Sequence, residues 1–292
     1  MKHYGSQSMY KTLHRVILKH PRHAFIHQQN LKNRWREFNY TEMPDYEKAL
    51  EEYRAFEGII KAHVEDVLYL PPTLEGGLDS LYTHDPVKVT DRGAVGFPMG
   101  KGLRAGETGE TLGFLQSLGI PILGSIQPPA KIEGGDVVWL DDERVALGLG
   151  YRTNMAGLEG FMEMTRDLIR EYIVVPLPHG GGEEECLHLM SLISIVDRDL
   201  AVVHSRYLPV FFRQRLLDMG FSLVEVPDEE YDTLACNVLA LGPRHCVMLE
   251  GNPITQAGLE KKGARVHTYP GREISIKGTG GPTCLTCPVA RE

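Results

Sequence analysis

A cysteine near the end of the chain stands in a segment built for close approach to a ligand. Residues 278–287 read GTGGPTCLTC, and Cys284 is the first of the two cysteines. Glycine has no Cβ, so the backbone before Cys284 can pass close to a bound molecule and present the thiol. A thiolate nucleophile needs a base, and the base needs a group that orients it. His188 in CLHLMS and Glu133 in IEGGD are the candidates for these two roles.

Two further carboxylates indicate the kind of electrophile. Asp79 and Asp85 lie six residues apart in LDSLYTHDP. Acyl transfer to a neutral amide would not need them, whereas Asp accepts paired hydrogen bonds from a guanidinium or amidinium. The residue types therefore predict attack of a thiolate on a planar, positively charged carbon.

Each of these residues also has a purely structural interpretation. A single cysteine is often a small buried hydrophobe, and His188 between two leucines is typical of a core histidine. Asp79 and Asp85 could cap local turns, and IEGGD could be a turn. The functional hypothesis depends on where the fold places these residues together.

The CxxC formed by Cys284 and Cys287 favours neither a metal nor a redox site. Zinc would need two more soft ligands at suitable spacing, but Cys236 and Cys246 lie ten residues apart and form no second CxxC. A redox pair normally opens a helix, whereas Pro288 follows Cys287 in a strand-like segment. We expect no metal and no cofactor.

The elements that would position these residues follow a repeat. Four strand–turn–strand patterns are predicted at 87–97, 137–149, 192–204 and 238–249. Five helices are predicted at 44–62, 108–118, 155–171, 205–219 and 253–262. A short apolar strand follows each helix, at 65–70, 120–126, 172–177, 221–226 and 264–269.

The fifth unit is divided between the ends of the chain. Its first hairpin strand is predicted at about 283–290, and a spare strand at 15–19 would supply the second. Pairing the two would close a five-fold pseudosymmetric α/β propeller of ββαβ units and remove an open sheet edge. We expect one catalytic domain over 1–292, with the reactive loops meeting in a central cleft; a two-domain α/β protein with open mixed sheets is the alternative.

Composition excludes several classes of protein. The 31 Lys and Arg against 39 Asp and Glu give a net charge of −8, which argues against a nucleic-acid partner. No apolar run is long enough to span a membrane. Five cysteines without an export signal suggest reduced thiols and a cytoplasmic location.

The motifs, taken in order, resemble those of one superfamily. LDSLYTHD is similar to its Asp-x-x-Phe-x-Glu-Asp strand, and EGGDVVWLDDERVALGLGYRTN to its GGDV…GLxxRTN segment. CLHLMS is similar to its GLHLKS, and GGPTC to its glycine-then-TC motif. The chain therefore resembles the guanidino-group-modifying superfamily, which has the pentein fold, and within it most closely dimethylarginine dimethylaminohydrolase.

The resemblance implies a role for each matched residue. Cys284 would be the nucleophile, His188 the general acid and base, and Glu133 the group that orients His188. Asp85 would hold the guanidinium and Asp79 its substituted nitrogens, while Arg152 and Arg104 would bind a substrate carboxylate.

Three positions depart from the related enzymes. His84 occupies the substrate-binding position where dimethylaminohydrolases carry Glu, and Asp79 and Met190 differ from arginine deiminases. The reaction class is therefore better specified than the substrate.

The implied reaction needs no cofactor and leaves three functions open. The first is hydrolysis of a guanidino compound bearing a carboxylate, such as a methylated arginine, to a ureido product such as citrulline and an amine, or to ammonia as in an arginine deiminase. The second is transfer of the amidino group to an amine, and the third is binding without catalysis. The expected partners are a small guanidino substrate and, as an open option, a second copy of the chain. Residues 23–39 are expected to form either a lid over the cleft or a surface segment packed by its aromatic residues.

Overall fold

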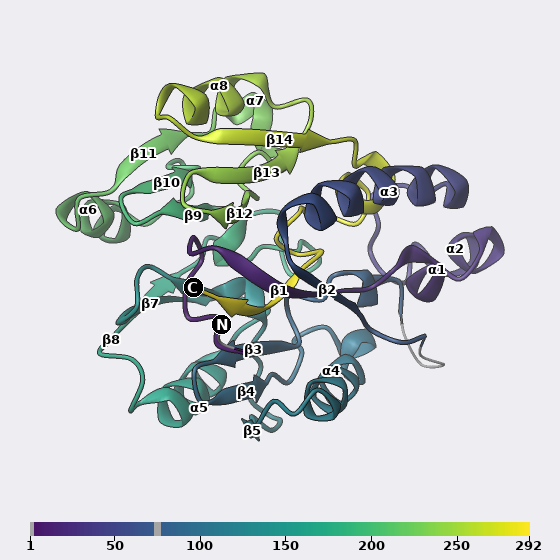
Figure 1. Ribbon diagram of the computed structural model, residues 1–292, viewed down its shortest axis with the longest axis horizontal. Coiled ribbons are helices and arrows are strands. Elements are labelled where there is room, and N and C mark those ends of the chain that lie inside the picture. Colours follow the sequence, from purple (N-terminus) through teal and green to yellow (C-terminus); the bar gives the residue numbers. More distant parts are fainter. Residues whose placement is uncertain (1–2, 73–76) are drawn as a thin grey trace.

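The computed structural model describes residues 3–72 and 77–292, which fold into an α/β protein with five three-stranded sheets. In every sheet the central strand is antiparallel to one neighbour and parallel to the other. Figure 1 shows the longer helices at the outside of the molecule and the strands nearer its centre.

The four predicted hairpins are confirmed. They are β3 (Val87–Thr90) with β4 (Gly93–Gly96), β6 (Val137–Trp139) with β7 (Arg144–Leu149), β9 (Ile193–Asp197) with β10 (Leu200–Val203), and β12 (Leu239–Gly242) with β13 (His245–Leu249). The third strands of these sheets are β5 (Ile122–Ser125), β8 (Glu171–Pro176), β11 (Ser222–Glu225) and β14 (Arg265–Tyr269).

The five predicted helices are present, with two boundaries corrected. They are α3 (Tyr46–His63), α4 (Glu107–Ser117), α5 (Met155–Thr165), α6 (Val210–Asp218) and α8 (Pro253–Lys261). Helix α6 begins after Pro209 rather than at 205, because proline has no N–H to donate within a helix. Helix α5 ends at Thr165 rather than at 171, and a turn leads from it into β8.

Three short helices were not predicted, because four to seven residues are too few to show a helical period. They are α1 (Pro21–Ala24), α2 (Gln28–Arg34) and α7 (Asp228–Tyr231).

The two ends of the chain pair in one sheet, as predicted. Strand β1 (Leu13–Leu18) is antiparallel to β15 (Cys287–Arg291) and parallel to β2 (Asp66–Tyr69). In Figure 1 the N- and C-termini lie close together beside this pair. Neighbouring sheets also touch through β15 with β3, β1 with β12, β9 with β12, and β6 with β9.

The predicted start of the last strand was wrong. Strand β15 begins at Cys287, and Cys284 lies in the preceding turn. The Thr286 hydroxyl donates to the Thr283 carbonyl at 2.9 Å, and the Leu285 N–H donates to the Gly281 carbonyl at 3.1 Å. Threonine favours strands, but its hydroxyl also stabilises turns by bonding to nearby backbone.

The apolar faces of helices and sheets form the core. Trp139 on β6, Phe97 after β4 and Phe161 on α5 are buried and make edge-to-face contacts. None of the helices in residues 3–72 and 77–292 has the length and apolar content needed to span a bilayer.

Candidate active site

The loops that lead from a third strand to the next hairpin carry the candidate residues other than Arg104 and Arg152, which follow β4 and β7. Asp79 lies in the 3₁₀ turn Leu78–Leu81, and Glu133 and His188 each precede a similar turn, Gly134–Asp136 and Leu189–Ser191. These loops surround a cleft of about 420 Å³. The predicted residues that line it are Asp79, Asp85, Arg104, Arg152, His188 and Cys284.

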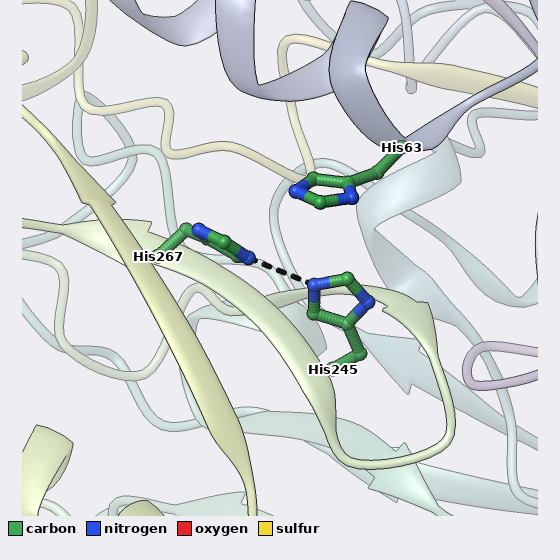
Figure 2. A group of neighbouring side chains, drawn as sticks. All are labelled: His63, His245 and His267. Carbon is green, nitrogen blue, oxygen red and sulfur yellow. Dashed lines mark hydrogen bonds between the residues drawn. The ribbon is translucent and has the colours of Figure 1, made fainter.

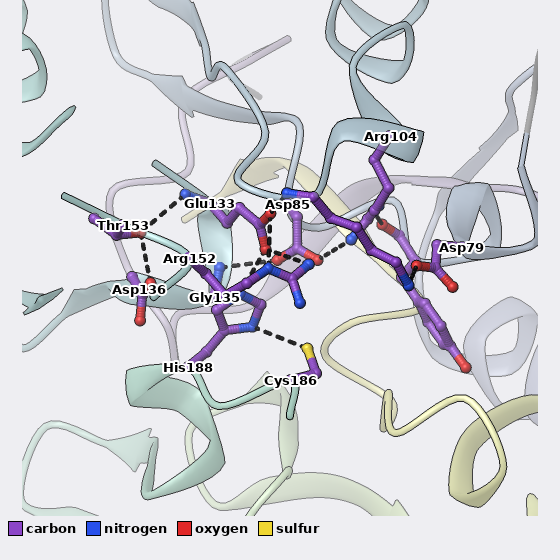
Figure 3. Close-up of polar contacts among 12 residues, drawn as sticks. Asp79, Asp85, Arg104, Glu133, Gly135, Asp136, Arg152, Thr153, Cys186 and His188 are labelled. Carbon is purple, nitrogen blue, oxygen red and sulfur yellow. Dashed lines mark hydrogen bonds and ion pairs between the residues drawn. The ribbon is translucent and has the colours of Figure 1, made fainter. Parts of the chain in front are cut away.

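His188 is held by Glu133 at the wall of the cleft. Its Nε2 lies 2.8 Å from Glu133 Oε2, and the Glu133 side chain is fully buried (Figure 3). Burial alone would raise the pKa of Glu133, but Arg152 and His188 lower it to about 2. Burial opposes protonation of His188, yet the Cys186 thiol and the Asp85 carboxylate raise the pKa of His188 well above its usual range. The pair is therefore a carboxylate and an imidazolium in the free protein.

The GGD sequence fixes the position of this pair. A Cβ on Gly135 would lie 2.5 Å from His188 Nδ1, so only glycine allows the imidazole to pack here. The Asp136 carboxylate accepts the Leu189 N–H at 2.8 Å and the Thr153 hydroxyl at 2.6 Å. Asp136 thus ties the Glu133 loop to the His188 loop, a structural role that the sequence analysis did not assign.

Cys284 contacts a residue that the sequence analysis missed. Asn237 Nδ2 donates to Cys284 Sγ at 3.2 Å, and Asn237 Oδ1 accepts the Thr283 N–H at 3.0 Å. Asn237 lies between β11 and β12, in the loop of the fourth unit, the one unit for which no site residue was predicted. Burial, with a smaller effect of Asp85, raises the pKa of Cys284 to about 12. Its thiol is therefore neutral in the free protein.

A second thiol, Cys186, shares the cleft with Cys284. Cys186 Sγ lies 3.8 Å from His188 Nδ1, the ring nitrogen that does not face Glu133 (Figure 3). Burial opposes ionisation of Cys186, but His188 and Arg152 lower its pKa below the usual value. Two residues before His188, Cys186 belongs to the same CLHLMS segment, but its contact with the imidazole depends on how the loop folds.

Asp85 is positioned by a backbone N–H and an arginine. Its Oδ1 accepts the Gly135 N–H at 3.0 Å, and its Oδ2 accepts Arg104 Nη1 at 2.7 Å. His188 and Arg104 outweigh burial and lower the pKa of Asp85, so the carboxylate is ionised. Arg104 is buried and also donates to Glu107 and to the Tyr82 carbonyl. Most of its hydrogen-bond donors are therefore used within the protein, although a role in binding a substrate carboxylate was expected.

Two further cations of the cleft, Lys101 and Arg152, are also paired. Lys101 Nζ lies 2.6 Å from Asp79 Oδ2 and donates to the Phe38 carbonyl at 2.6 Å. Arg152 uses Nε and Nη2 on Glu133, at 3.1 and 2.9 Å.

His84 is placed apart from the other predicted residues. Its Nδ1 lies 3.0 Å from the Thr286 carbonyl and its Nε2 lies 2.5 Å from Lys88 Nζ. Burial and Lys88 lower the pKa of His84 to about 3. His84 lines a separate, smaller cavity with Lys88 and Cys287 instead of the cleft.

The cleft also contains a group with the geometry of a metal site. Ligand atoms of Asp85, Glu133 and His188 lie within 4.8 Å of one another. However, Arg104 and Arg152 already neutralise the two carboxylates. The arrangement is that of a salt-bridge network able to hold a cationic organic group beside a thiol.

The segment 23–39 contacts both the hydrophobic core and the cleft. Phe25 and Leu31 are buried in the core, while Phe38 and Asn39 line the cleft. Asn39 also hydrogen bonds to Glu184 on the opposite rim. The segment is thus packed by its apolar residues, and its end reaches over the site.

The chain is similar in sequence or fold to several known proteins. The arginine deiminase of Mycobacterium avium is 31% identical over 194 residues, which are 56% of this chain and about half (47%) of that protein. Dimethylarginine dimethylaminohydrolase from Pseudomonas aeruginosa, solved with citrulline, is 23% identical with a TM-score of 0.77, covering 94% of this chain and 99% of that chain. The amidinotransferase SxtG from Microseira wollei is 14% identical with a TM-score of 0.82, covering 100% and 98%. At these identities the two structures show a shared fold.

A family model defines the relationship. The model described as N,N dimethylarginine dimethylhydrolase, eukaryotic, matches residues 22–291, nearly the whole chain. Its solved neighbours are members of the pentein superfamily of guanidino-modifying enzymes. The chain therefore belongs to the N,N dimethylarginine dimethylhydrolase family of the pentein superfamily.

Proposed function

We propose that the protein is a cysteine hydrolase that cleaves a C–N bond of a guanidino compound bearing a carboxylate. The observation that carries this proposal is the meeting, in one cleft, of the Cys284 thiol, the His188–Glu133 pair and the carboxylates of Asp79 and Asp85. A methylated arginine is the substrate that the family favours, and citrulline plus an amine would be its products.

Substrate binding would follow from the free lone pairs of the aspartates. Each carboxylate oxygen accepts more than one hydrogen bond, so Asp85 can keep Gly135 and Arg104 while it receives the substrate guanidinium. Asp79 would contact the substituted nitrogens after exchange with Lys101. Arg152 leaves Nη1 for the substrate carboxylate, and Arg104 would act mainly by keeping Asp85 ionised.

The bound cation would activate the nucleophile. A guanidinium beside Sγ favours the thiolate and lowers the pKa of Cys284 from about 12, and the thiol proton passes to solvent because His188 is already protonated. The thiolate attacks the guanidinium carbon and forms a C–S bond. Protonated His188 donates its Nδ1 proton to the departing amine, the C–N bond breaks, and a thiouronium remains on Cys284.

Water would complete the cycle. Neutral His188 takes a proton from water, and the hydroxide adds to the thiouronium carbon. The C–S bond then breaks to release the thiolate and the ureido product, and the proton of the added hydroxyl passes to solvent. Glu133 holds the imidazole so that Nδ1 faces the reacting atoms throughout.

Amidino transfer is the second candidate, supported by the shared fold of SxtG. The two activities differ in whether water or an amine reaches the intermediate. The contact between Asn39 and Glu184 narrows the opening of the cleft, which favours a small molecule as the acceptor of the amidino group. We also propose that the five sheets close into a propeller around the cleft, which the β1–β15 pairing supports.

A substrate screen tests the proposal. Arginine, methylated arginines, agmatine and short guanidino acids would be assayed for ureido product with and without added glycine. We expect turnover of a carboxylate-bearing guanidine, weaker turnover of agmatine, which lacks that carboxylate, and none by Cys284→Ser. A glycine-dependent product would establish transfer instead, and no turnover of any guanidine would refute both.

A further inference from the structure

Three histidines that play no part in the cleft come together at the edge of one sheet. His63 is the last residue of α3, His245 is the first of β13, and His267 is the third of β14. One nitrogen of each ring lies within 4.8 Å of the others. The ring centroids are 4.7 to 5.0 Å apart, and Figure 2 shows the three rings facing one another.

The fold brings the rings together from distant parts of the sequence. In the parallel pair β13–β14, His245 is opposite Arg265, and His267 is two residues further along β14. Alternate residues of a strand share a face, so His245 and His267 project from the same side of the sheet. Helix α3 packs against β14 on that side and adds His63.

The contacts of these three rings leave ring nitrogens available to bind a cation. His245 Nε2 lies 2.8 Å from His267 Nε2, so one ring donates its N–H to the other. Within residues 3–72 and 77–292, none of the three rings forms an ion pair with a carboxylate. Neutral imidazole is the form that binds metals.

We infer that His63, His245 and His267 form a binding site for a divalent transition-metal ion, with Zn²⁺ as the best-fitting ion. Three imidazoles and a water are a familiar tetrahedral zinc ligand set. Zn–N bonds of 2.0–2.1 Å place the ligand nitrogens about 3.3 Å apart. The observed separations, from 2.8 Å up to 4.8 Å, bracket this value, so small side-chain rotations complete the site.

The surroundings suit a structural ion at the surface. All three residues are half-buried, which leaves room for a water ligand and a path for the ion. His63 ends an 18-residue helix, whose C-terminal carbonyls favour positive charge. Arg265 is a nearby positive charge that would repel the ion, but its side chain is exposed and can turn to solvent. The ion would join α3, from the first part of the chain, to the sheet of β13 and β14.

Metal uptake should be measured with the two cleft thiols removed, since thiolates also bind Zn²⁺. In full-length Cys186→Ser/Cys284→Ser protein treated with chelator, calorimetry with ZnCl₂ should show one ion per chain at micromolar affinity. His63→Gln/His245→Gln/His267→Gln in the same background should weaken binding at least about 100-fold, as expected when most ligands are lost. His3→Gln, an exposed histidine outside the cluster, is the matched control and should bind as the parent does.

A second measurement needs no cluster variant and so does not depend on whether the triple variant folds. Zn²⁺ should protect the three histidines, and not His3, from diethyl pyrocarbonate, as read by peptide mass spectrometry. Co²⁺ in place of Zn²⁺ should give the visible absorption of a tetrahedral site. The inference is overturned if the protein without the two cleft thiols takes up no Zn²⁺ at micromolar concentration. It is also overturned if the triple variant folds and binds Zn²⁺ as tightly as its parent, or if bound Zn²⁺ leaves the three histidines unprotected.

Discussion

The cleft proposed as the active site and the three-histidine cluster are both polar groups gathered by the fold, but their charges are arranged in opposite ways. In the cleft each buried cation faces an anion: Arg104 faces Asp85 and Glu107, Arg152 faces Glu133, and Lys101 faces Asp79. In the cluster, three like rings face one another beside Arg265.

The difference shows two ways to prepare a site. The paired charges of the cleft fix carboxylates and an imidazolium in place before a ligand binds, which is the preorganisation that electrostatic catalysis needs. The cluster holds only imidazole rings, so a bound metal cation would stabilise their close approach. Changes to the cleft should therefore act on turnover, and changes to the cluster on stability and metal uptake.

The largest loss of activity is expected from a change to Glu133, which contacts both His188 and Arg152. Glu133→Gln removes the acceptor of His188 Nε2 and leaves Arg152 unpaired, so kcat should fall on the order of 10²–10⁴-fold, as when a catalytic histidine loses its orienting carboxylate. Glu107→Gln is the matched control. Burial raises the pKa of Glu107 to about 7, so this carboxylate is only partly ionised and its replacement by an amide removes less charge, and kcat should stay within about tenfold. Equal losses in the two variants would remove the special role of Glu133.

Asp85→Asn should have the next largest effect. It leaves Arg104 without one partner and weakens the hold on the substrate cation, and kcat/KM should fall about 10²–10³-fold. Asp79→Asn, which takes the charge partner from Lys101 and leaves Asp85 in place, should cost less, about tenfold. Steady-state kinetics on the best substrate of the screen would check both, and the reverse order would contradict the proposed division of roles.

The two thiols should differ in reactivity in the free protein. The pKa of Cys186 is lowered, so its thiolate forms below the usual thiol range, whereas Cys284, with a pKa of about 12, stays neutral up to strongly alkaline pH. Below pH 9, iodoacetamide should therefore modify Cys186 faster, by about 10-fold or more. The two residues fall in different tryptic peptides, 171–198 and 278–291, so mass spectrometry separates them.

A saturating guanidino ligand sharpens the same comparison, because it lowers the pKa of Cys284. Cys186→Ser should keep turnover within about tenfold, since Cys186 is not the proposed nucleophile. Faster alkylation of Cys284 than of Cys186 without ligand would show that the thiol is ionised before substrate binds.

The smallest effect is expected in the cluster. His63→Gln should leave kcat and KM unchanged, since none of the three histidines lines the cleft. Without metal it should change the free energy of unfolding by less than about 1 kcal/mol. With excess Zn²⁺ the parent protein should gain several degrees in Tm, about 3–8 °C, that the variant lacks. A loss of activity in His63→Gln would mean that the two regions are coupled.

Most of the fold could be predicted from the sequence because the repeat is written in local patterns. Alternating apolar residues around polar turns gave the four hairpins, and the same logic paired β1 with β15. The start of β15 was predicted too early because Thr283 and Thr286 favour strands in isolation, while their contacts in the turn depend on the folded loop.

The site was predictable in outline and not in its contacts. The motifs identified Cys284, His188, Glu133 and the two aspartates, and the structure places them on converging loops. Asn237 could have been found by asking what the fourth unit contributes. The pairing of Arg104 with Asp85 could not have been found, because it depends on how two separate loops pack together. The approach of Cys186 to His188 could not have been found either, because it depends on the path of a single loop.

We propose that Cys284, rather than the more acidic Cys186, carries the covalent intermediate. Acid quenching during turnover, followed by trypsin digestion and mass spectrometry, tests it directly. We expect an adduct on Cys284 in peptide 278–291, heavier by the mass of the substrate less that of the released amine. An adduct on Cys186 in peptide 171–198, or continued turnover by Cys284→Ser, would contradict it.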